Sequence, residues 1–266
     1  MFAIRTRYSK YVSLVLNLTM VKSLKKALDI MEFVSESNNS PSIVQIANHL
    51  KLNRTTTYRL VHTLHSQGYL KKDGDKNGYQ IGLRLLPLAA RLLDSDILRK
   101  EALPHLQELA QKTGERINLG IIFQGEVLYL GGVEKPSLPV VYTRFGKKAP
   151  VHCCSLGKIL LAYLPEQEVD RILSQKPLVK MTENTITDPG TFKKHLAEIR
   201  TQGYAIDYGE HIPGSYCISA LIRDTTRSGI GSISISSGSL EKLKGYLELL
   251  LQTAEVISHL MGYMGR

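Results

Sequence analysis

Residues 21–82 contain three short helical segments followed by a strand–turn–strand pattern, and this succession restricts the fold more than any other feature of the sequence. In the first segment, apolar residues recur every three or four positions, as they do on one face of a helix. Ser42 and Asn53 are residue types that cap helix N-termini, so we predict a second helix after Ser42 and a third over Arg54–Gln67. Gly68 is expected to end the third helix.

A predicted hairpin follows the three helices. Tyr69–Lys72 and Tyr79–Gly82 have the composition of short strands, and the residues between them are mainly Asp, Asn and Gly, which tolerate the left-handed backbone of tight turns. Three helices and a hairpin in about 60 residues predict a winged helix-turn-helix, in which one helix enters the major groove of DNA.

The charge of the chain is concentrated in the same region. Residues 1–90 hold 13 Lys and Arg against 5 Asp and Glu, whereas residues 91–266 hold 21 against 19. The N-terminal third therefore carries most of the formal net charge of +10, which favours a polyanionic partner for that part of the chain.

A chain of 266 residues is long enough for two domains. We predict an N-terminal extension over 1–20, the winged helix-turn-helix over 21–82, a linker helix over 83–98 and a second domain over 99–266. The linker is rich in leucine, with Pro87 kinking it or marking its first turn. Because neither core would cover its apolar face, we expect a second copy of the chain to do so in a homodimer.

The second domain alternates strands with helices, which predicts an α+β fold around an antiparallel sheet. The predicted strands are Ile117–Phe123, Glu126–Gly131, Val140–Arg144, Ala205–Asp207, Cys217–Arg223 and Gly229–Ser236. The predicted helices are Arg99–Lys112, Gly157–Tyr163, Glu166–Ser174, a helix that begins at Pro189 and ends before Gly203, and Ser239–Leu260.

The first turn of the third helix supplies the candidate DNA contacts, because this turn faces base edges in helix-turn-helix proteins. The candidates are Arg54, Thr55, Thr56, Tyr58 and Arg59 on the helix, with Lys71 and Lys72 on the hairpin. The alternative is an N-capped helix and a turn that are merely solvated.

Enzyme motifs are absent from the sequence. It contains no GxSxG, HExxH, P-loop or GxGxxG motif, and His152 beside Cys153 is a poor nucleophile–base pair because sequence neighbours seldom face each other. Cys153, Cys154 and Cys217 form no CxxC pair, so we expect reduced thiols rather than a disulfide or zinc site. We therefore predict no catalytic residue, no metal and no cofactor.

Small polar residues interrupt the apolar strands of the second domain. Ser234 and Ser236 alternate with isoleucines and share one face of a strand, and Asp207 and Cys217 occupy other strands. These four side chains predict a polar pocket for an anionic or hydroxylated metabolite, although the serine face could instead be exposed to solvent. In the loop Pro150–Lys158, backbone N–H groups could hold a carboxylate, and Lys158 could add a charge or extend to solvent.

No membrane contact is expected. No run of 18 apolar residues occurs, and polar residues interrupt the apolar stretch that follows the basic N-terminus, so we expect neither a transmembrane span nor a signal peptide and place the protein in the cytoplasm. Met20 could be the true start.

In this order, the motifs resemble the IclR-type family of bacterial transcriptional regulators across about Val21 to Gly262. The matching stretches are Ser23–Ile30, Arg54–Leu60, Gly68–Leu70, Tyr79–Gly82, Ala149–Lys158, Asn184–Asp188, Gly203–Asp207, Glu210, Pro213–Gly214 and Cys217–Ile218. The chain departs from the family pattern at Lys51, where glycine is usual in the helix-turn-helix connector, and at Thr57, where an apolar residue is common.

The resemblance implies a winged helix-turn-helix joined by a linker helix to a GAF-like effector-binding domain. It implies dimers or tetramers on double-stranded operator DNA, usually as a repressor, and control by a small carboxylated or aromatic metabolite. By similarity, the effector pocket would include Ser155, Leu156, Gly157, Asp207, Cys217, Ser234 and Ser236. Two alternatives are a metabolite-binding enzyme or sensor with secondary DNA binding, and a non-specific architectural DNA binder.

Overall fold

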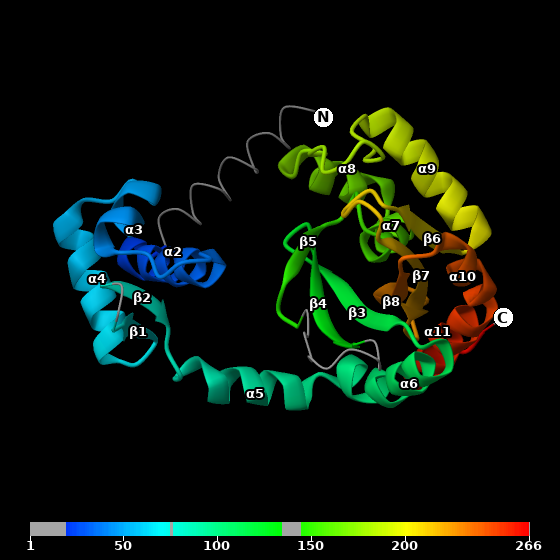
Figure 1. The fold of residues 1–266 in the computed structure, drawn as a ribbon, viewed down its shortest axis with the longest axis horizontal. Coiled ribbons are helices and arrows are strands. Elements are labelled where there is room, and N and C mark those ends of the chain that lie inside the picture. The colour runs from blue at the N-terminus through cyan, green and yellow to red at the C-terminus, as the bar shows by residue number, and fades with distance from the viewer. Residues whose placement is uncertain (1–19, 75–76, 135–144, 266) are drawn as a thin grey trace, which may run out of the picture. The chain divides into compact units, whose positions relative to one another are not determined.

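The computed structural model describes residues 20–74, 77–134 and 145–265. The chain forms two compact units that divide between Leu92 and Leu93. Figure 1 labels their elements. Within the described residues, no helix is both long enough and apolar enough to span a membrane.

The first unit begins with three helices, α2 (Lys22–Glu36), α3 (Ile43–His49) and α4 (Arg54–Ser66). The predicted caps are confirmed. Ser42 and Gln45 form a reciprocal capping box on α3, and the Asn53 side chain accepts a hydrogen bond of 2.7 Å from the N–H of Thr56 in α4. The buried core between the helices and the hairpin consists of Ile30, Val34, Ile46, Val61, Leu70 and Tyr79.

The predicted hairpin is present as strands β1 (Leu70–Asp73) and β2 (Gly78–Ile81). Its end is bound to the turn before α3, because Ser40 donates to the Asp73 carboxylate at 2.5 Å and accepts from the Gln80 amide at 2.9 Å. Gly78 approaches this turn so closely that an added Cβ would lie 2.1 Å from the Ser40 carbonyl oxygen. These contacts hold the wing against the helices.

Two departures from the family pattern, at Lys51 and Thr57, have local explanations. Lys51 adopts a left-handed backbone with φ 51°, so it makes the turn in the conformation that glycine favours. Thr57 is fully buried, and its hydroxyl donates to the Asn53 carbonyl oxygen at 2.9 Å, which satisfies the polar group inside the core.

Two helices follow the wing. α5 (Leu85–Ser95) has Pro87 in its first turn, and none of its residues is buried within the chain. The exposed leucines on and beside it are Leu83, Leu86, Leu88 and Leu92. α6 (Ile97–Thr113) ends at Gly114, whose φ of 67° allows the left-handed cap.

A six-stranded antiparallel sheet forms the centre of the second unit, in the order β5-β4-β3-β8-β7-β6. The strands are β3 (Arg116–Phe123), β4 (Glu126–Val133), β5 (Lys148–Pro150), β6 (Tyr204–Tyr208), β7 (Tyr216–Arg223) and β8 (Gly229–Ser237). β5 was not predicted, and the strand predicted at Val140–Arg144 lies outside the described residues.

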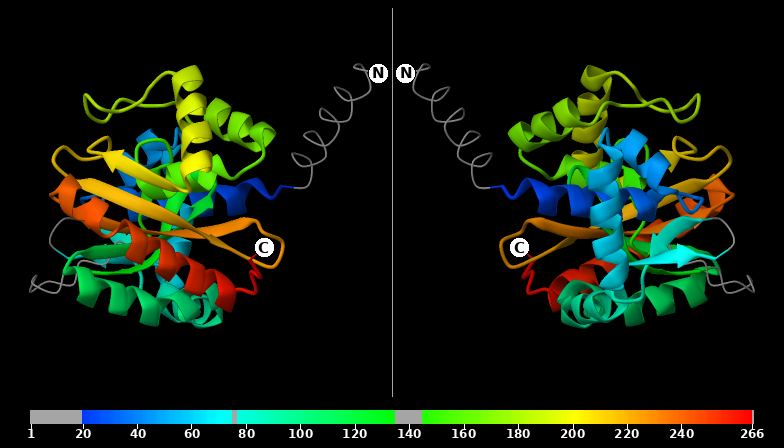
Figure 2. Two further views of the ribbon diagram at one scale, coloured as in Figure 1. Left: turned by 90° about the vertical axis from the view of Figure 1, so that its right-hand side faces the viewer. Right: turned by 90° about the vertical axis from the view of Figure 1, so that its left-hand side faces the viewer.

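Helices cover both faces of this sheet (Figure 2). On one face, α6, α10 (Leu240–Gly245) and α11 (Leu247–Leu260) pack on isoleucines and other apolar side chains. On the opposite face lie α7 (Ser155–Ala162), α8 (Glu166–Gln175) and α9 (Pro189–Gln202). The predicted single helix Ser239–Leu260 is wrong, because the helix breaks at Tyr246, whose hydroxyl donates to the Thr113 carbonyl oxygen at 3.1 Å.

Candidate functional site

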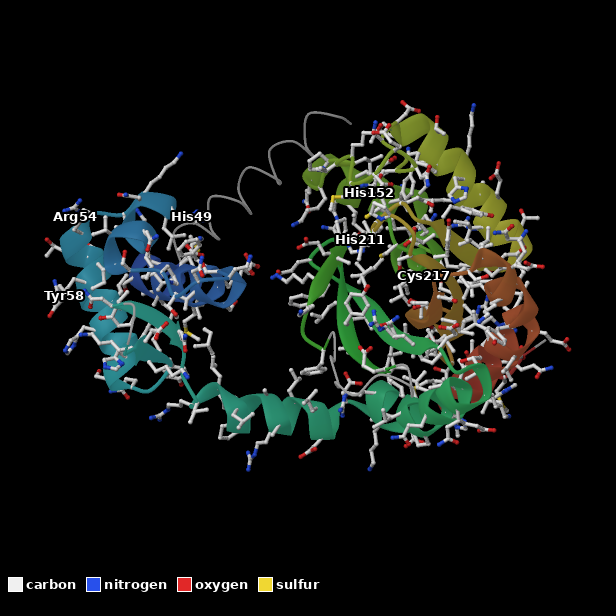
Figure 3. The ribbon with its side chains drawn as sticks, in the orientation of Figure 1. His49, Arg54, Tyr58, His152, His211 and Cys217 are labelled. Atoms are coloured by element: carbon white, nitrogen blue, oxygen red, sulfur yellow. The ribbon has the colours of Figure 1, made fainter. Side chains whose placement is uncertain are left out.

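The first turn of α4 presents the predicted DNA contacts to solvent. Arg54, Thr55, Tyr58 and Arg59 are exposed, whereas Thr56 is half-buried and supplies the N–H that Asn53 caps. Figure 3 shows Arg54 and Tyr58 projecting outward from α4. The turn therefore offers two cations, hydroxyl groups and an aromatic ring on one free surface.

The two predicted wing lysines do not share a face. Lys71 pairs in register with Gln80 on the outer face of the hairpin, while Lys72 pairs with Tyr79 on the face that carries the core. Successive side chains of a strand point to opposite sides. Both lysines are exposed, on opposite faces of the hairpin.

In the second unit, the sheet brings distant polar residues into one row beneath α7. The Asn118 side-chain amide of β3 donates to the hydroxyl oxygens of Ser234 at 3.2 Å and Ser236 at 3.1 Å on β8. Cys217 of β7 lies beside Ser236, with 3.1 Å between its Sγ and the Ser236 Oγ. We call Asn118, Ser234, Ser236 and Cys217 the polar row.

The polar row is only partly open. Asn118 and Ser234 are buried, whereas Ser236 and Cys217 are half-buried. The alternative of a solvent-exposed serine face is therefore wrong for Ser234.

The N-terminus of α7 lies over the same face of the sheet, because Ser232, two residues before Ser234, donates to the Leu156 carbonyl oxygen at 3.2 Å. No side chain caps this helix. The Ser155 hydroxyl is buried and has no hydrogen-bond partner among the described residues. Leu156 belongs to the hydrophobic core, so only its backbone is placed to meet a ligand.

Gly157 has a packing role in α7. A Cβ at this position would lie 2.3 Å from the Val151 carbonyl oxygen, so only glycine lets the helix approach the preceding loop. The residues that precede α7 in the predicted loop Pro150–Lys158 therefore pack closely against the first turn of this helix.

A buried charge cluster adjoins α7. Lys158 is fully buried, and its ammonium group forms an ion pair with Glu210 and donates to the Ile206 carbonyl oxygen at 2.5 Å. The alternative that Lys158 extends to solvent is therefore wrong. Asp207 is also buried, and its Oδ1 accepts from the N–H of Glu210 at 2.6 Å. Lys158 is thus ion-paired with Glu210, and the second carboxyl group, that of Asp207, is buried nearby.

Burial shifts the titration of this cluster. It raises the pKa of Asp207 to about 6, and the nearby Glu210 carboxylate adds to the effect. Burial lowers the pKa of His152, whose Nε2 lies 2.9 Å from the Val179 carbonyl oxygen, so the neutral imidazole can donate there. It raises the pKa of Cys153 to about 12 and that of Cys154 well above its ordinary value, so both remain thiols at neutral pH.

The sheet register places Asp207 directly opposite Cys217, which in turn lies opposite Ser236. The structure thus arranges four predicted effector residues, Asp207, Cys217, Ser234 and Ser236, on the α7 face of three adjacent strands. Ser155 and Gly157 belong to the helix that covers this face.

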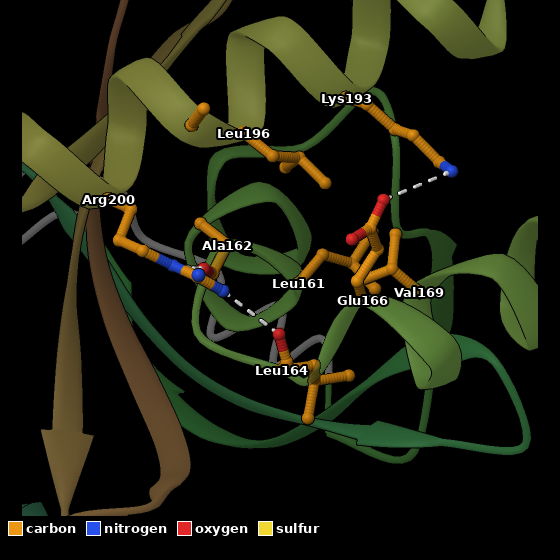
Figure 4. A pocket seen from close by; sticks show the side chains of 9 residues that line it. Leu161, Ala162, Leu164, Glu166, Val169, Lys193, Leu196 and Arg200 are labelled. Atoms are coloured by element: carbon orange, nitrogen blue, oxygen red, sulfur yellow. Dashed lines mark hydrogen bonds and ion pairs between the residues drawn. The ribbon is translucent and has the colours of Figure 1, made fainter.

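A separate hollow of about 250 Å³ lies between α7, α8 and α9 (Figure 4). Its floor includes Leu161, Val169 and Leu196, and Arg200 at its rim donates to the Leu164 carbonyl oxygen at 2.9 Å. None of the predicted effector residues lines it. In the described ranges, no three His, Cys, Asp or Glu side chains are grouped so that they could hold a metal ion.

Family models match both units. Residues 23–74 match the IclR helix-turn-helix domain, and residues 90–259, more than half of the chain, match the bacterial transcriptional regulator IclR C-terminal domain. The chain belongs to the IclR family of bacterial transcriptional regulators. The predicted family and fold class are therefore confirmed, and this IclR-family chain is a DNA-binding regulator.

Individual relatives agree with this assignment. The transcriptional repressor IclR of Escherichia coli is 32% identical over 218 residues, which cover 81% of this chain and 80% of the relative. The crystal structure of the Thermotoga maritima IclR matches with a TM-score of 0.67 and 31% identity, covering 92% of this chain and all of that one.

A third relative was solved with a ligand. An IclR homologue from Microbacterium hydrocarbonoxydans, complexed with 4-hydroxybenzoate, matches with a TM-score of 0.77 and 26% identity, covering 91% of this chain and 99% of that one. The curated relatives are transcriptional regulators, so the chain is a regulator and not an enzyme.

Two features of the candidate site are not predicted by the sequence analysis. The sequence pattern predicts Asn118 only as part of a strand, although a buried amide inside an apolar strand needs a polar neighbour. The ion pair between Lys158 and Glu210 joins residues 52 positions apart, and no local sequence pattern predicts it.

The raised pKa of Asp207 predicts a pH-dependent stability cost. Above pH 6 the folded protein must hold this buried carboxylate ionised, whereas below the ordinary value of 3.8 it is neutral in both the folded and unfolded chains. A difference of about two pKa units corresponds to about 3 kcal/mol. Asp207 therefore lowers the free energy of unfolding at pH 8 relative to pH 4.

We expect Asp207→Asn to raise the free energy of unfolding at pH 8 by about 1–3 kcal/mol, with the gain shrinking below pH 5. Asparagine keeps the oxygen that accepts from Glu210. Urea denaturation followed by circular dichroism measures this, since the chain has no Trp. Asp224→Asn is the control, because hydrogen bonds from Thr226 lower the pKa of that exposed carboxyl and no gain is expected. A less stable Asp207→Asn protein at pH 8 would contradict the prediction.

Proposed function

We propose that this regulator is a repressor that binds an inverted-repeat operator through α4 and leaves it when a small metabolite binds the second unit. Since its partner is double-stranded operator DNA, it acts in the cytoplasm. The metabolite carries a carboxylate, an aromatic ring or both, as 4-hydroxybenzoate does in the Microbacterium relative.

The exposed first turn of α4 is the observation that supports DNA reading most directly. Arg54 and Arg59 provide cations, and Thr55 and Tyr58 provide hydroxyl groups, on a helix whose other side is fixed in the core. Lys71 and Lys72 add positive charge on the wing. Phosphate contacts by such cations give affinity that falls steeply with salt, while base-edge contacts give specificity.

The polar row supports the effector half of the proposal. It places an amide, two hydroxyls and a thiol on the face of the sheet over which the uncapped helix α7 packs. The buried Ser155 hydroxyl without a partner adds a further donor on that helix. Uncapped helix N-termini and hydroxyl donors favour a carboxylate ligand.

We also propose a homodimer, or a tetramer built from two dimers, with α5 as the dimer contact. Leu86 and Leu92 of α5 are 66% and 68% exposed, and an apolar face of this kind needs a cover. A dimer also matches the symmetry of an inverted repeat. Sedimentation equilibrium of the full chain tests this, and a monomeric mass would contradict it.

The function is tested with DNA from upstream of the gene. We expect the purified protein to bind it more tightly than random DNA at ~150 mM salt. At least one compound from a panel of small carboxylates and aromatic acids should release it. Equal, weak binding to both DNAs, unaffected by every compound, would contradict the proposal and favour an architectural DNA binder.

Replacing Ser234 and Ser236 together with alanine should weaken effector binding by about 10–100-fold and leave operator binding unchanged. The double variant removes two hydroxyl donors but no part of α4. Operator release is measured against effector concentration, with circular dichroism as the folding check. Ser174→Ala on the exposed face of α8 is the matched control. An unchanged release curve would place the effector elsewhere.

A further inference from the structure

Asn118 is the one member of the polar row that touches both serines. It is 4% exposed, and its Nδ2 donates to Ser234 at 3.2 Å and to Ser236 at 3.1 Å. An amide nitrogen carries two hydrogens, so this side chain uses both of them on the two hydroxyl oxygens. Nothing in the family match or the sequence patterns assigns it a role.

This arrangement decides which way the serine hydroxyls point. Each hydroxyl has one hydrogen and two lone pairs, and accepting from Asn118 occupies one lone pair while leaving the hydrogen available. Ser236 also lies 3.1 Å from the Cys217 sulfur, a thiol that is both a weak donor and a weak acceptor, so this contact does not compete strongly with a ligand oxygen. Each serine of the polar row therefore keeps its hydroxyl hydrogen, together with one lone pair, for whatever binds above it.

The charged side chains near the polar row do not explain a preference for an anionic ligand. Arg116, on the same face of β3, has its guanidinium paired with Glu134 at 2.7 Å. Asp207 holds a carboxyl group in the same row of the sheet, which would by itself disfavour an anion. A preference for an anionic oxygen must then come from hydrogen-bond donors, namely the N-terminus of α7 and the serine hydroxyls of the polar row.

We propose that Asn118 is a positioning residue that sets the hydrogen-bond polarity of the effector site, so that the site selects a carboxylate over the corresponding primary amide. This inference rests on the proposed function, because it takes the polar row as the effector site. Asn118 acts through Ser234 and Ser236 and need not touch the ligand. The opposite orientation, with the amide oxygen accepting from both hydroxyls, would make the row select donor groups instead.

Matched acid and amide pairs test the proposal on the full chain. The probes are pyruvate with pyruvamide, lactate with lactamide, and 4-hydroxybenzoate with 4-hydroxybenzamide, each titrated by calorimetry. In at least one pair, the wild type should bind the acid about tenfold tighter or more, since hydrogen bonds to charged groups are the stronger ones. Equal binding, preference for the amide, or no binding of any acid at ~10 mM would overturn the proposal.

Asn118→Asp supplies the decisive comparison. A carboxylate at this position accepts from both serine hydroxyls, so the row then presents lone pairs and the preference for the acid should disappear or reverse. Asn118→Leu is neutral and cannot donate, so it should also lose the preference for the acid, which separates hydrogen-bond donation from the charge that Asp adds at the site. Gln167→Glu on exposed α8 controls for net charge alone and should keep the preference of the wild type. A variant that is merely misfolded would lose acid and amide alike, and circular dichroism identifies that case. Asn118→Ser, a short neutral donor, is then tested instead and should retain part of the preference for the acid.

An Asn118→Asp protein that is folded and still prefers the acid would overturn the proposal. Operator binding is measured separately on the same proteins. If the wild type does not recognise the operator, the proposed function is contradicted. The ratio of the affinities for acid and amide still reports on the role of Asn118 in that case. The two failures are therefore distinguishable.

Discussion

Lys158→Met is expected to lower the free energy of unfolding by about 3–5 kcal/mol, because removing one partner leaves a buried carboxylate without its counter-charge. Lys158 is fully buried in α7, where its ammonium holds Glu210 and the Ile206 carbonyl oxygen. Methionine has a similar length and fills the space, so the loss reports on charge rather than on a cavity. Urea denaturation at pH 7, followed by circular dichroism, measures the change.

A double-mutant cycle separates the ion pair from packing. Glu210→Gln combined with Lys158→Met removes both charges, and we expect it to recover most of the stability lost in Lys158→Met alone. Lys193→Met is the surface control, since that lysine on α9 is paired with exposed Asp170 and should cost little. A loss below about 1 kcal/mol in Lys158→Met would show that the pair carries no net stability.

Arg54→Ala is expected to weaken operator binding by about 10-fold or more per half-site while leaving the protein folded. Arg54 is the first residue of α4, is exposed, and makes no contact on which the Asn53 cap depends. Electrophoretic mobility shifts at several salt concentrations measure the affinity and its salt dependence. If Arg54 reads a base, specificity relaxes at one operator position, whereas a phosphate contact lowers the salt slope by about one.

Arg171→Ala is the matched control for this prediction. Arg171 is exposed on α8 in the second unit and forms a surface ion pair with Glu168. Its loss removes the same formal charge without altering the first turn of α4. Unchanged operator affinity in Arg54→Ala would remove Arg54 from the DNA contacts, and an equal loss in both variants would show only a general charge effect.

Much of the first unit could be predicted from the sequence because its signals are local. Ser42 and Asn53 cap the helices within three residues, and Gly68 ends α4 with a φ of 77°. The wing strands were displaced by one residue, since nothing local marks where pairing between β1 and β2 begins. The exposed turn of α4 followed from the same caps, because the cap sets which residues form the first turn.

The effector site could be predicted only in part. Period-2 alternation placed Ser234 and Ser236 on one face of β8, which is correct. It could not tell whether solvent or α7 covers that face, and Ser234 is in fact buried. The break of the C-terminal helix at Tyr246 was also missed, and the hydrogen bond that Tyr246 makes with the Thr113 carbonyl oxygen joins positions far apart in the chain.

The sequence by itself determined the helices of the first unit, the wing, the alternation of the strands and the concentration of positive charge, because each depends on residues a few positions apart. Only the tertiary structure decided that Asn118 meets Ser234 and that Lys158 is buried against Glu210. These partners are 116 and 52 residues apart. The register of the strands and the packing of helices on the sheet bring these partners together. Both result from the packing of the whole unit rather than from any local preference.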